Sequence, residues 1–242
     1  MTSPLKMHLG KGLPLLEATF LERPNQFTII AEYQGERIVG AMADRGRLID
    51  VMTPGRTLLM EHRPDPGRKT AYQFLAARSD MGHWVSLDTQ LPNRLVRQAL
   101  THHLIPELPP YTSFRAEYKL GRSRFDFMLE LESGERLLLE TKSVGQLDTD
   151  GIARFPDAPT TRGARHVREL MELQQEEGTQ SAVLFVVQGD TIQHMEPNVE
   201  IDPNFAQALQ EAHDAGVQLL ARACPLDETG LTWGEPCPIV LP

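Results

Sequence analysis

The chain has 242 residues, of which 40% are hydrophobic and 24% are charged, a composition ordinary for a globular protein with a sizeable core. Its two cysteines, Cys224 and Cys237, are too few for a disulfide framework or a cysteine-rich zinc site, so we expect a reducing compartment. No stretch approaches the roughly 18 apolar residues of a membrane span, and the first residues lack the apolar core of a signal peptide. We therefore expect a cytoplasmic protein without a membrane partner.

The formal net charge of −9 argues against a nucleic-acid partner, but the charge is unevenly distributed. Residues 1–88 hold 11 Lys and Arg against 10 Asp and Glu, whereas residues 89–242 hold 13 against 23. Within residues 37–78, eight basic residues stand against four acidic ones. The N-terminal part is therefore predicted to face phosphates, with Arg45 and Arg47 as candidate nucleic-acid contacts. A mixed, solvated surface is the alternative that the charges leave open.

Residues 14–88 are predicted to form a small β domain. Turn-forming pairs such as Gln34-Gly35 and Pro54-Gly55 separate short apolar segments, and none of the segments has the pattern of a long helix. The predicted strands are Leu15–Leu21, Phe27–Tyr33, Arg37–Met42, Arg56–His62, Thr70–Arg78 and Trp84–Leu87. Five or six short strands favour a small barrel, and the OB-fold is a barrel of this kind that binds nucleic acid.

The spacing of apolar residues changes at Leu91, where a helix is predicted that ends before Pro106. We place the domain boundary just before this helix, which divides the chain into domains 1–88 and 89–242. The later elements are predicted as a strand at Ser113–Leu120, a hairpin within Arg124–Val144, a long loop, a helix at Thr161–Glu177, a strand at Ser181–Gln188, a helix at Pro203–Ala215 and a strand at Val217–Ala223. This order predicts a mixed α/β sheet with the hairpin at its centre.

The hairpin at Arg124–Val144 alternates apolar and polar residues, as a half-buried strand pair does. A three-residue loop at 132–134, closed by Gly134 in the left-handed conformation, keeps the apolar side chains on one face. In this register Phe127 pairs with Leu139. A two-residue loop would mix the two faces, so we predict the three-residue loop.

The same register sets Asp126 opposite Glu140, with β-carbons roughly 4.5–5.5 Å apart. Two facing carboxylates raise the pKa of one of them unless a cation lies between them. Aspartate followed by Glu-x-Lys on the next strand resembles the PD-(D/E)XK nucleases. The resemblance implies catalytic roles for Asp126, Glu140 and Lys142, in which the two acids bind Mg²⁺ or Mn²⁺ and the lysine orients or deprotonates a water. Glu117 is a third candidate metal ligand, and a solvated polar hairpin face is the alternative.

The predicted helix at Thr161–Glu177 begins with cationic residues, although helix N-termini favour anions. A bound phosphate would resolve this conflict, as would pairing with acids of the hairpin. Arg162, Arg165 and His166 of this helix, with Arg124 of the hairpin, are therefore candidate nucleic-acid contacts. For His166 alone, a hydrogen-bonded structural histidine is the alternative.

Four segments carry a resemblance to a known family: Asn93–Leu95, Ser123–Phe127, Glu140–Val144 and Phe155–Leu170. Together they resemble the sugar fermentation stimulation protein A (SfsA) family over most of the chain. The resemblance implies an N-terminal OB-fold, a C-terminal PD-(D/E)XK nuclease-like α/β domain, DNA binding and a regulatory role in sugar, notably maltose, metabolism. At 41–48 the chain departs from the family, because the His-x-Pro-Asn pattern expected there is absent.

The resulting hypothesis is a DNA-binding protein with a metal-dependent phosphodiesterase site, acting as an endo- or exonuclease if it turns over. One alternative is a DNA-binding transcriptional regulator without catalysis, favoured by the family's name. Another is an acidic metal-binding or interaction module that does not bind nucleic acid, favoured by the net charge. The sequence leaves the oligomeric state and the choice among these three open.

Overall fold

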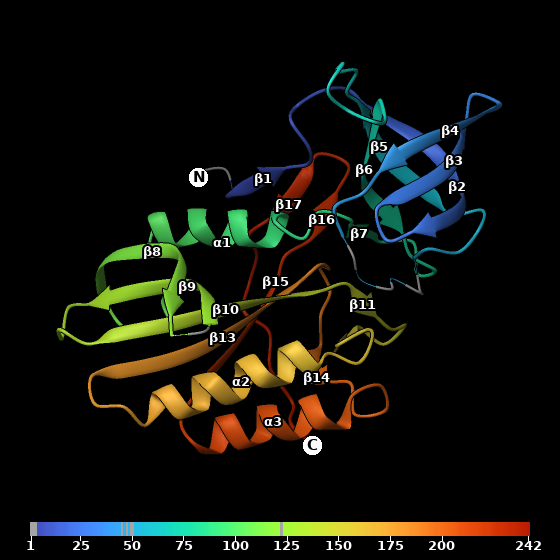
Figure 1. Cartoon of the computed structure of the whole chain (residues 1–242). Helices are drawn as coiled ribbons and strands as arrows, with labels where there is room; N and C mark the ends of the chain where they lie inside the picture. The colour runs from blue at the N-terminus through green and yellow to red at the C-terminus, as the bar shows by residue number, and fades with distance from the viewer. Residues whose placement is uncertain (1–3, 45, 47, 49–50, 122) are drawn as a thin grey trace.

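The structure is a computed structural model that describes residues 4–44, 46, 48, 51–121 and 123–242. Figure 1 shows a β-barrel beside a larger α/β region, to which both ends of the described chain belong. Among the described residues, no helix is long and apolar enough to cross a membrane.

The N-terminal region forms a closed barrel. Its sheet contains β2 (Leu15–Asn25), β3 (Thr28–Tyr33), β4 (Glu36–Ala41), β5 (Thr57–His62), β6 (Tyr72–Arg78) and the short β7 (Trp84–Ser86). The strand order is β4-β3-β2-β5-β6-β7, and an additional parallel pairing of β4 with β6 closes the barrel. Gly40 lies at the closure, where a β-carbon would come within 2.5 Å of the Phe74 ring. The predicted small barrel is thus confirmed.

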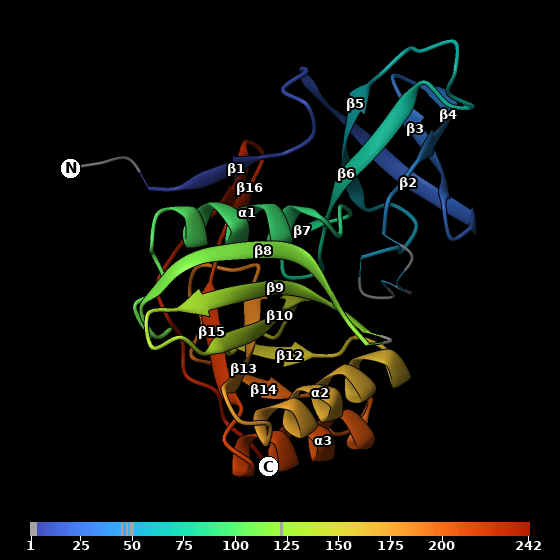
Figure 2. The same ribbon diagram turned by 60° about the vertical axis from the view of Figure 1, so that its left-hand side comes forward.

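A five-stranded sheet forms the centre of the α/β region, in the order β15-β13-β10-β9-β8. The strands are β8 (Tyr111–Leu120), β9 (Ser123–Leu131), β10 (Arg136–Val144), β13 (Thr179–Val187) and β15 (Gln218–Ala223). Helix α1 (Leu91–Thr101) covers one face, while α2 (Thr161–Gln174) and α3 (Pro203–Asp214) cover the other (Figure 2). Apolar side chains of alternating strand positions pack into a separate core on each face. The predicted mixed α/β sheet with a central hairpin is confirmed.

The hairpin register agrees with the prediction. Leu139 pairs with Phe127, and Arg136 pairs with Glu130. The backbone amide of Gly134 donates to the carbonyl of Leu131, and Gly134 has φ +89°, the left-handed conformation that closes a three-residue loop.

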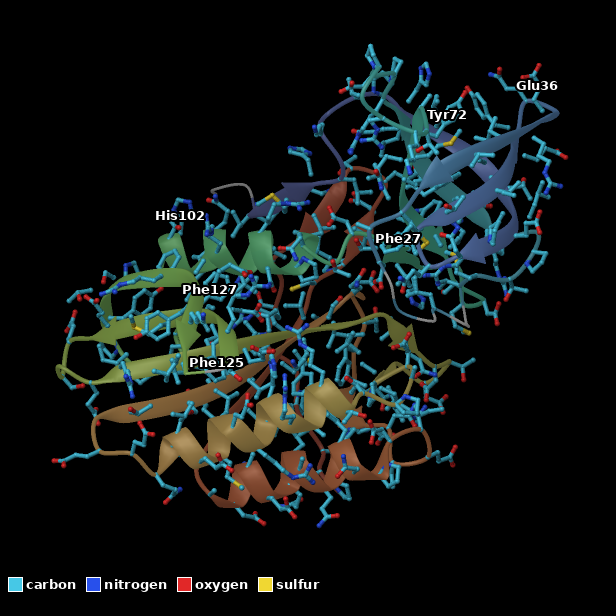
Figure 3. The ribbon with its side chains drawn as sticks, viewed as in Figure 1. Phe27, Glu36, Tyr72, His102, Phe125 and Phe127 are labelled. Atoms are coloured by element: carbon cyan, nitrogen blue, oxygen red, sulfur yellow. The ribbon has the colours of Figure 1, made fainter. Side chains whose placement is uncertain are left out.

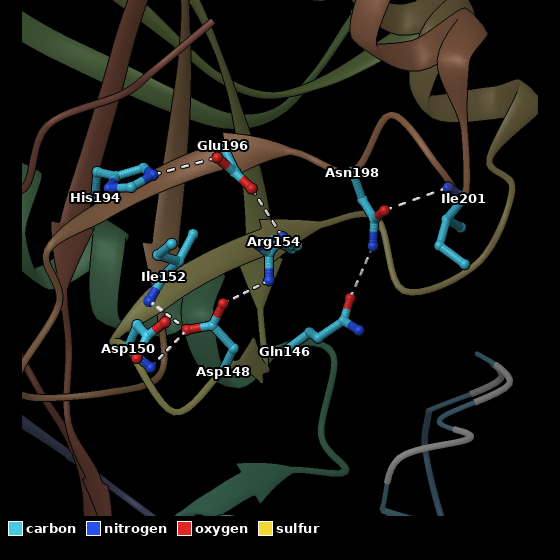
Figure 4. Close-up of polar contacts among 9 residues, drawn as sticks. All are labelled: Gln146, Asp148, Asp150, Ile152, Arg154, His194, Glu196, Asn198 and Ile201. Atoms are coloured by element: carbon cyan, nitrogen blue, oxygen red, sulfur yellow. Dashed lines mark hydrogen bonds and ion pairs between the residues drawn. The ribbon is translucent and has the colours of Figure 1, made fainter. Parts of the chain in front are cut away.

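Two features of the sheet region differ from the prediction. The segment after the hairpin, predicted as one long loop, contains β11 (Gln146–Leu147) and β12 (Ile152–Phe155), which form a small sheet with β14 (His194–Pro197). Figure 4 shows the polar network that supports this sheet: Arg154 lies between Asp148, at 2.6 Å, and Glu196, at 2.8 Å. Helix α2 ends at Gln174 rather than at Glu177, because the residues that follow turn into β13.

The N-terminal strand was not predicted. Strand β1 (Lys6–His8) pairs with β17 (Gly230–Thr232), which also pairs with β16 (Leu226–Asp227). Strand β1 therefore lies beside the C-terminal region, and the chain then enters the barrel and continues into the sheet region through α1. The division into domains 1–88 and 89–242 remains a prediction.

Buried hydrogen bonds join the barrel to the sheet. The side chain of Gln188, 2% exposed, accepts from the backbone amide of Ser86 at 2.7 Å and donates to Ser143 Oγ at 2.8 Å. The carboxylate of Glu61, which is fully buried in the barrel, accepts from the amides of Lys11 and Leu13 in the segment that leads from β1 into β2. These contacts position the barrel beside the strand that carries Glu140.

Candidate functional site

Asp126 lies on β9 between two buried phenylalanines, Phe125 and Phe127, which point into the cores on opposite faces of the sheet (Figure 3). Its carboxylate accepts two hydrogen bonds, from the side-chain amide of Asn93 at 2.7 Å and from the backbone amide of Thr141 at 2.8 Å. The first donor comes from α1 and the second from β10. Asp126 therefore connects three elements at the point where β9 and β10 stop pairing.

Glu140 is the second acid of the site, and it is 5% exposed. Its Oε1 atom accepts from Lys142 Nζ at 2.7 Å and from His166 Nδ1 at 2.8 Å. Its Oε2 atom is buried, and no described residue forms a hydrogen bond with it. Both donors thus converge on one oxygen of the carboxylate, and the other oxygen has no hydrogen-bond partner among the residues that the structure describes.

Their surroundings move the pKa values of the two acids in opposite directions. Burial, and then repulsion from Glu140, raises the pKa of Asp126 to about 6. For Glu140, burial acts to raise the pKa, but the opposing effects of Lys142 and His166 prevail and lower it to about 2. The predicted repulsion between the two acids therefore falls on Asp126, whose hydrogen-bond donors within the described residues are the neutral amides of Asn93 and Thr141.

The donor set fits a hard divalent cation. An unpaired buried carboxylate oxygen costs free energy, and a cation at Glu140 Oε2 would remove that cost. Each Asp126 oxygen accepts one hydrogen bond and keeps a second lone pair. The described residues contain no group of three or more His, Cys, Asp or Glu side chains arranged to hold one ion. Two carboxylates suit Mg²⁺ or Mn²⁺ better than a metal that needs a full protein cage, because Mg²⁺ keeps several of its waters.

The other residues predicted for the site lie around this centre. Glu117 is an exposed residue on β8, and its carboxylate is paired with Arg124 Nε at 2.9 Å. Arg162 is exposed in the first turn of α2, and Arg165 Nε lies 3.7 Å from Glu169. Their roles as a metal ligand and as nucleic-acid contacts remain predictions. Arg45 and Arg47 lie outside the described residues.

His166 is placed differently from a surface nucleic-acid contact. Its ring is 3% exposed and packs behind Glu140, 6.3 Å from the Phe125 ring centroid. This environment agrees with the alternative that the sequence left open for His166, a hydrogen-bonded structural histidine. The helical spacing points Arg162 and Arg165 outward while His166 joins the buried face with Gly163.

Several cations of the barrel are paired with acids. Arg63 contacts Glu61, and the remaining pairs are Arg37 with Glu22, Arg56 with Asp80 and Arg78 with Glu228. The predicted excess of basic residues at 37–78 therefore overstates the positive charge available to a ligand. Arg78 also stacks on Trp84, with its guanidinium carbon 4.5 Å from the ring centroid.

Asn93 is a site residue to which the sequence reasoning gave no role. It lies in the first turn of α1, and its amide fixes one oxygen of Asp126. The available signal was its place in the Asn93–Leu95 segment of the family resemblance. The backbone amide of Thr141 had no sequence signal, because every residue except proline carries one.

Comparison with known proteins covers both regions. Residues 90–230 match the sugar fermentation stimulation protein RE domain, and residues 21–87 match the SfsA N-terminal OB domain. Sugar fermentation stimulation protein homologues are similar along the chain. The homologue of Chloroflexus aurantiacus is 46% identical over 98% of this chain and 90% of its own length, and that of Clostridium tetani is 36% identical over 93% and 96%.

The solved structure of Pyrococcus furiosus SfsA in complex with Ca²⁺ is similar in fold. It superposes with a TM-score of 0.84 at 28% identity, over 97% of this chain and all of that one. The order of elements, the OB barrel and the two domain matches agree with the expected resemblance. The chain belongs to the sugar fermentation stimulation protein (SfsA) family.

Proposed function

We propose that this protein binds DNA and hydrolyses its phosphodiester bonds with Mg²⁺ or Mn²⁺ held by Asp126 and Glu140. The observation that carries the proposal is the buried, unpartnered Oε2 of Glu140 beside a second carboxylate whose pKa is raised to about 6. Strongly perturbed acids that converge on one point are typical of functional sites. The Ca²⁺ bound by the Pyrococcus furiosus relative supports a divalent ion as the missing partner.

Different residues of the chain have different roles in this proposal. The bound ion would polarise the phosphate and offset the charges of the two acids. Lys142 is 12% exposed in its side chain and projects beside Glu140, where its ammonium can orient an attacking water or bind a phosphate oxygen. Asn93 and the Thr141 amide hold Asp126 in place.

His166 is a positioning residue in this proposal. It donates to Oε1 of Glu140 from a buried place on α2, which fixes the carboxylate and would leave Oε2 available to hold an ion. Lys142 shares the same oxygen, so His166 keeps that oxygen satisfied when the lysine turns toward substrate. The exposed Arg162 and Arg165, and Arg124 on β9, are proposed phosphate contacts around the centre.

Cleavage assays test the proposal. Supercoiled plasmid and single-stranded oligonucleotides are incubated with Mg²⁺ or Mn²⁺ and with wild type, Asp126→Ala or Glu130→Ala. Glu130 lies on the same strand but is paired with Arg115 of the edge strand β8, so its variant is the matched control. We expect product from wild type and from the control, and none from Asp126→Ala. Absence of product under every metal condition would refute the phosphodiesterase activity.

A second candidate, DNA binding and gene regulation without turnover, is favoured by one contact. Lys142 donates directly to Glu140, so the lysine already supplies a cation to the acid and is engaged away from substrate. The same experiment separates the candidates when binding is measured beside cleavage. Salt-dependent binding without product supports the regulator, and the link to sugar metabolism that the family name implies would then act through DNA binding.

A further inference from the structure

We infer that a groove beside Asp126, between α1 and strands β8 and β9, binds the phosphodiester backbone of the nucleic-acid strand that leads away from the site. This inference rests on the proposed function. The groove encloses about 370 Å³. Gln90, Arg94, Arg97 and Gln98 line its helix wall, and Glu117 and Asp126 line its strand wall. The hollow is therefore continuous with one of the two proposed metal ligands.

The helix wall presents donors at regular spacing. Positions 90, 94, 97 and 98 follow the i, i+4, i+7, i+8 pattern, which places their side chains along one face of α1. Guanidinium and amide groups are the side-chain donors that commonly contact phosphate oxygens. A row of such donors follows a chain of phosphates better than it fits a single small anion.

Arg97 is the cation of this wall whose guanidinium has no polar partner among the described residues. It is exposed, and within the described part of the chain its guanidinium forms no ion pair or hydrogen bond. Arg94, in contrast, is paired with Asp88 at 2.9 Å. An anionic ligand in the groove would thus meet one uncommitted guanidinium about one helical turn from Asn93, whose side chain contacts Asp126.

The strand wall carries an unusual backbone conformation. Glu117 has φ +54°, a left-handed value that is strained for a residue with a β-carbon. It lies between the pairs Ala116–Phe127 and Tyr118–Phe125, at the level of Asp126. Strain of this kind is often found next to functional sites.

The pairing of Glu117 with Arg124 changes the charge of the strand wall. Arg124 Nε lies 2.9 Å from the Glu117 carboxylate, so this acid is offset on its own side of the groove. Asp126 is the remaining acid there, and it would be offset by the ion of the proposed site. A groove with both acids compensated and a free arginine opposite them accepts a polyanion.

The test compares two exposed arginines by fluorescence anisotropy of a labelled single-stranded oligonucleotide in Ca²⁺, at 50 and 200 mM salt. Arg97→Gln removes the groove cation, and Arg115→Gln removes an arginine that is 64% exposed on β8 and paired with Glu130, outside the groove. We expect Arg97→Gln to weaken binding roughly two- to fivefold, as for an exposed ion pair. Its salt dependence should be shallower by about 0.7 in log–log slope. Arg115→Gln should match wild type, and thermal unfolding should verify that both variants fold.

The outcomes separate the groove from the proposed function. If wild type binds with a steep salt dependence and Arg97→Gln binds equally well, the groove is refuted while DNA binding stands. Equal losses in both variants would also refute it, because the affinity would then come from diffuse surface charge. If wild type shows no salt-dependent binding, the proposed function and the groove fail together. A loss confined to Arg97→Gln supports the groove whether or not the protein cleaves.

Discussion

Replacing Asp126 by asparagine should make the stability of the metal-free protein less sensitive to a rise in pH from 5 to 8. The pKa of Asp126 is raised from 3.8 to about 6, so the folded state favours the protonated acid. The stabilisation is fully present below pH 3.8 and is lost as the pH rises through about 6. A pKa displacement of this size corresponds to roughly 3 kcal/mol, of which about half is lost between pH 5 and 8.

The assay is the thermal unfolding midpoint of wild type and Asp126→Asn at pH 5 and pH 8, in chelator. The stability difference between the two proteins should shift by roughly 1.5 kcal/mol in favour of the variant, or about 3–6 °C for a chain of this size. Comparing differences cancels the titration of distant groups. Asparagine replaces one of the two acceptor oxygens of Asp126 by a donor amide, so a constant loss at both pH values is expected as well.

Addition of Mn²⁺ completes the experiment. An ion that binds the folded state raises the midpoint of wild type with concentration, by about 2.7 kcal/mol at one hundred times its dissociation constant. Asp126→Asn should respond far less. The reasoning is refuted if the two proteins change in parallel between pH 5 and 8, or if millimolar Mn²⁺ leaves the wild-type midpoint unchanged.

Three further predictions concern residues around the site and the contact of Glu61 with the segment between β1 and β2. His166→Ala should weaken Mn²⁺ binding about 10–100-fold, as measured by calorimetry. His166→Gln should recover most of the lost affinity, because its amide can donate to Glu140. Equal affinities of the two variants would contradict the positioning role. Glu117→Gly should be roughly 1 kcal/mol more stable than Glu117→Ala in urea unfolding. Both variants lack the ion pair with Arg124, but only alanine retains the backbone strain at φ +54°. An alanine variant at least as stable as the glycine variant would count against that strain. Glu61→Ala should lower the free energy of unfolding by roughly 3–5 kcal/mol, because it leaves Arg63 and the two backbone amides between β1 and β2 without their buried acceptor. An unchanged unfolding midpoint would argue against this contact.

Local sequence patterns were sufficient to predict the elements that surround the site. The alternation of residues 124–144 and the loop chemistry of Gly134 determine the hairpin register, and a one-residue slip would expose the apolar face that packs in the core. The register in turn predicts that Asp126 and Glu140 are close. The barrel strands follow from turn signals at short intervals, which also act locally.

Long-range contacts could not be predicted in the same way. Strand β1 has three residues and pairs with β17 near the other end of the chain, where Lys6 meets Asp227 across 221 positions. A count of charges along the sequence could not predict the pairing of Arg78 with Glu228 for the same reason. The pKa of Glu140 is lowered by Lys142, which is near in sequence, and also by His166, which lies on a helix 26 residues after Glu140 and whose contribution could not be predicted from local patterns.

The most direct test of the account is the location of Mn²⁺ in crystals of the wild-type protein, by anomalous diffraction at the manganese absorption edge. The account predicts a peak within coordination distance of Glu140 Oε2 and a carboxylate oxygen of Asp126, which disappears in Asp126→Asn. A wild-type crystal in millimolar Mn²⁺ with no peak between these two carboxylates would contradict it.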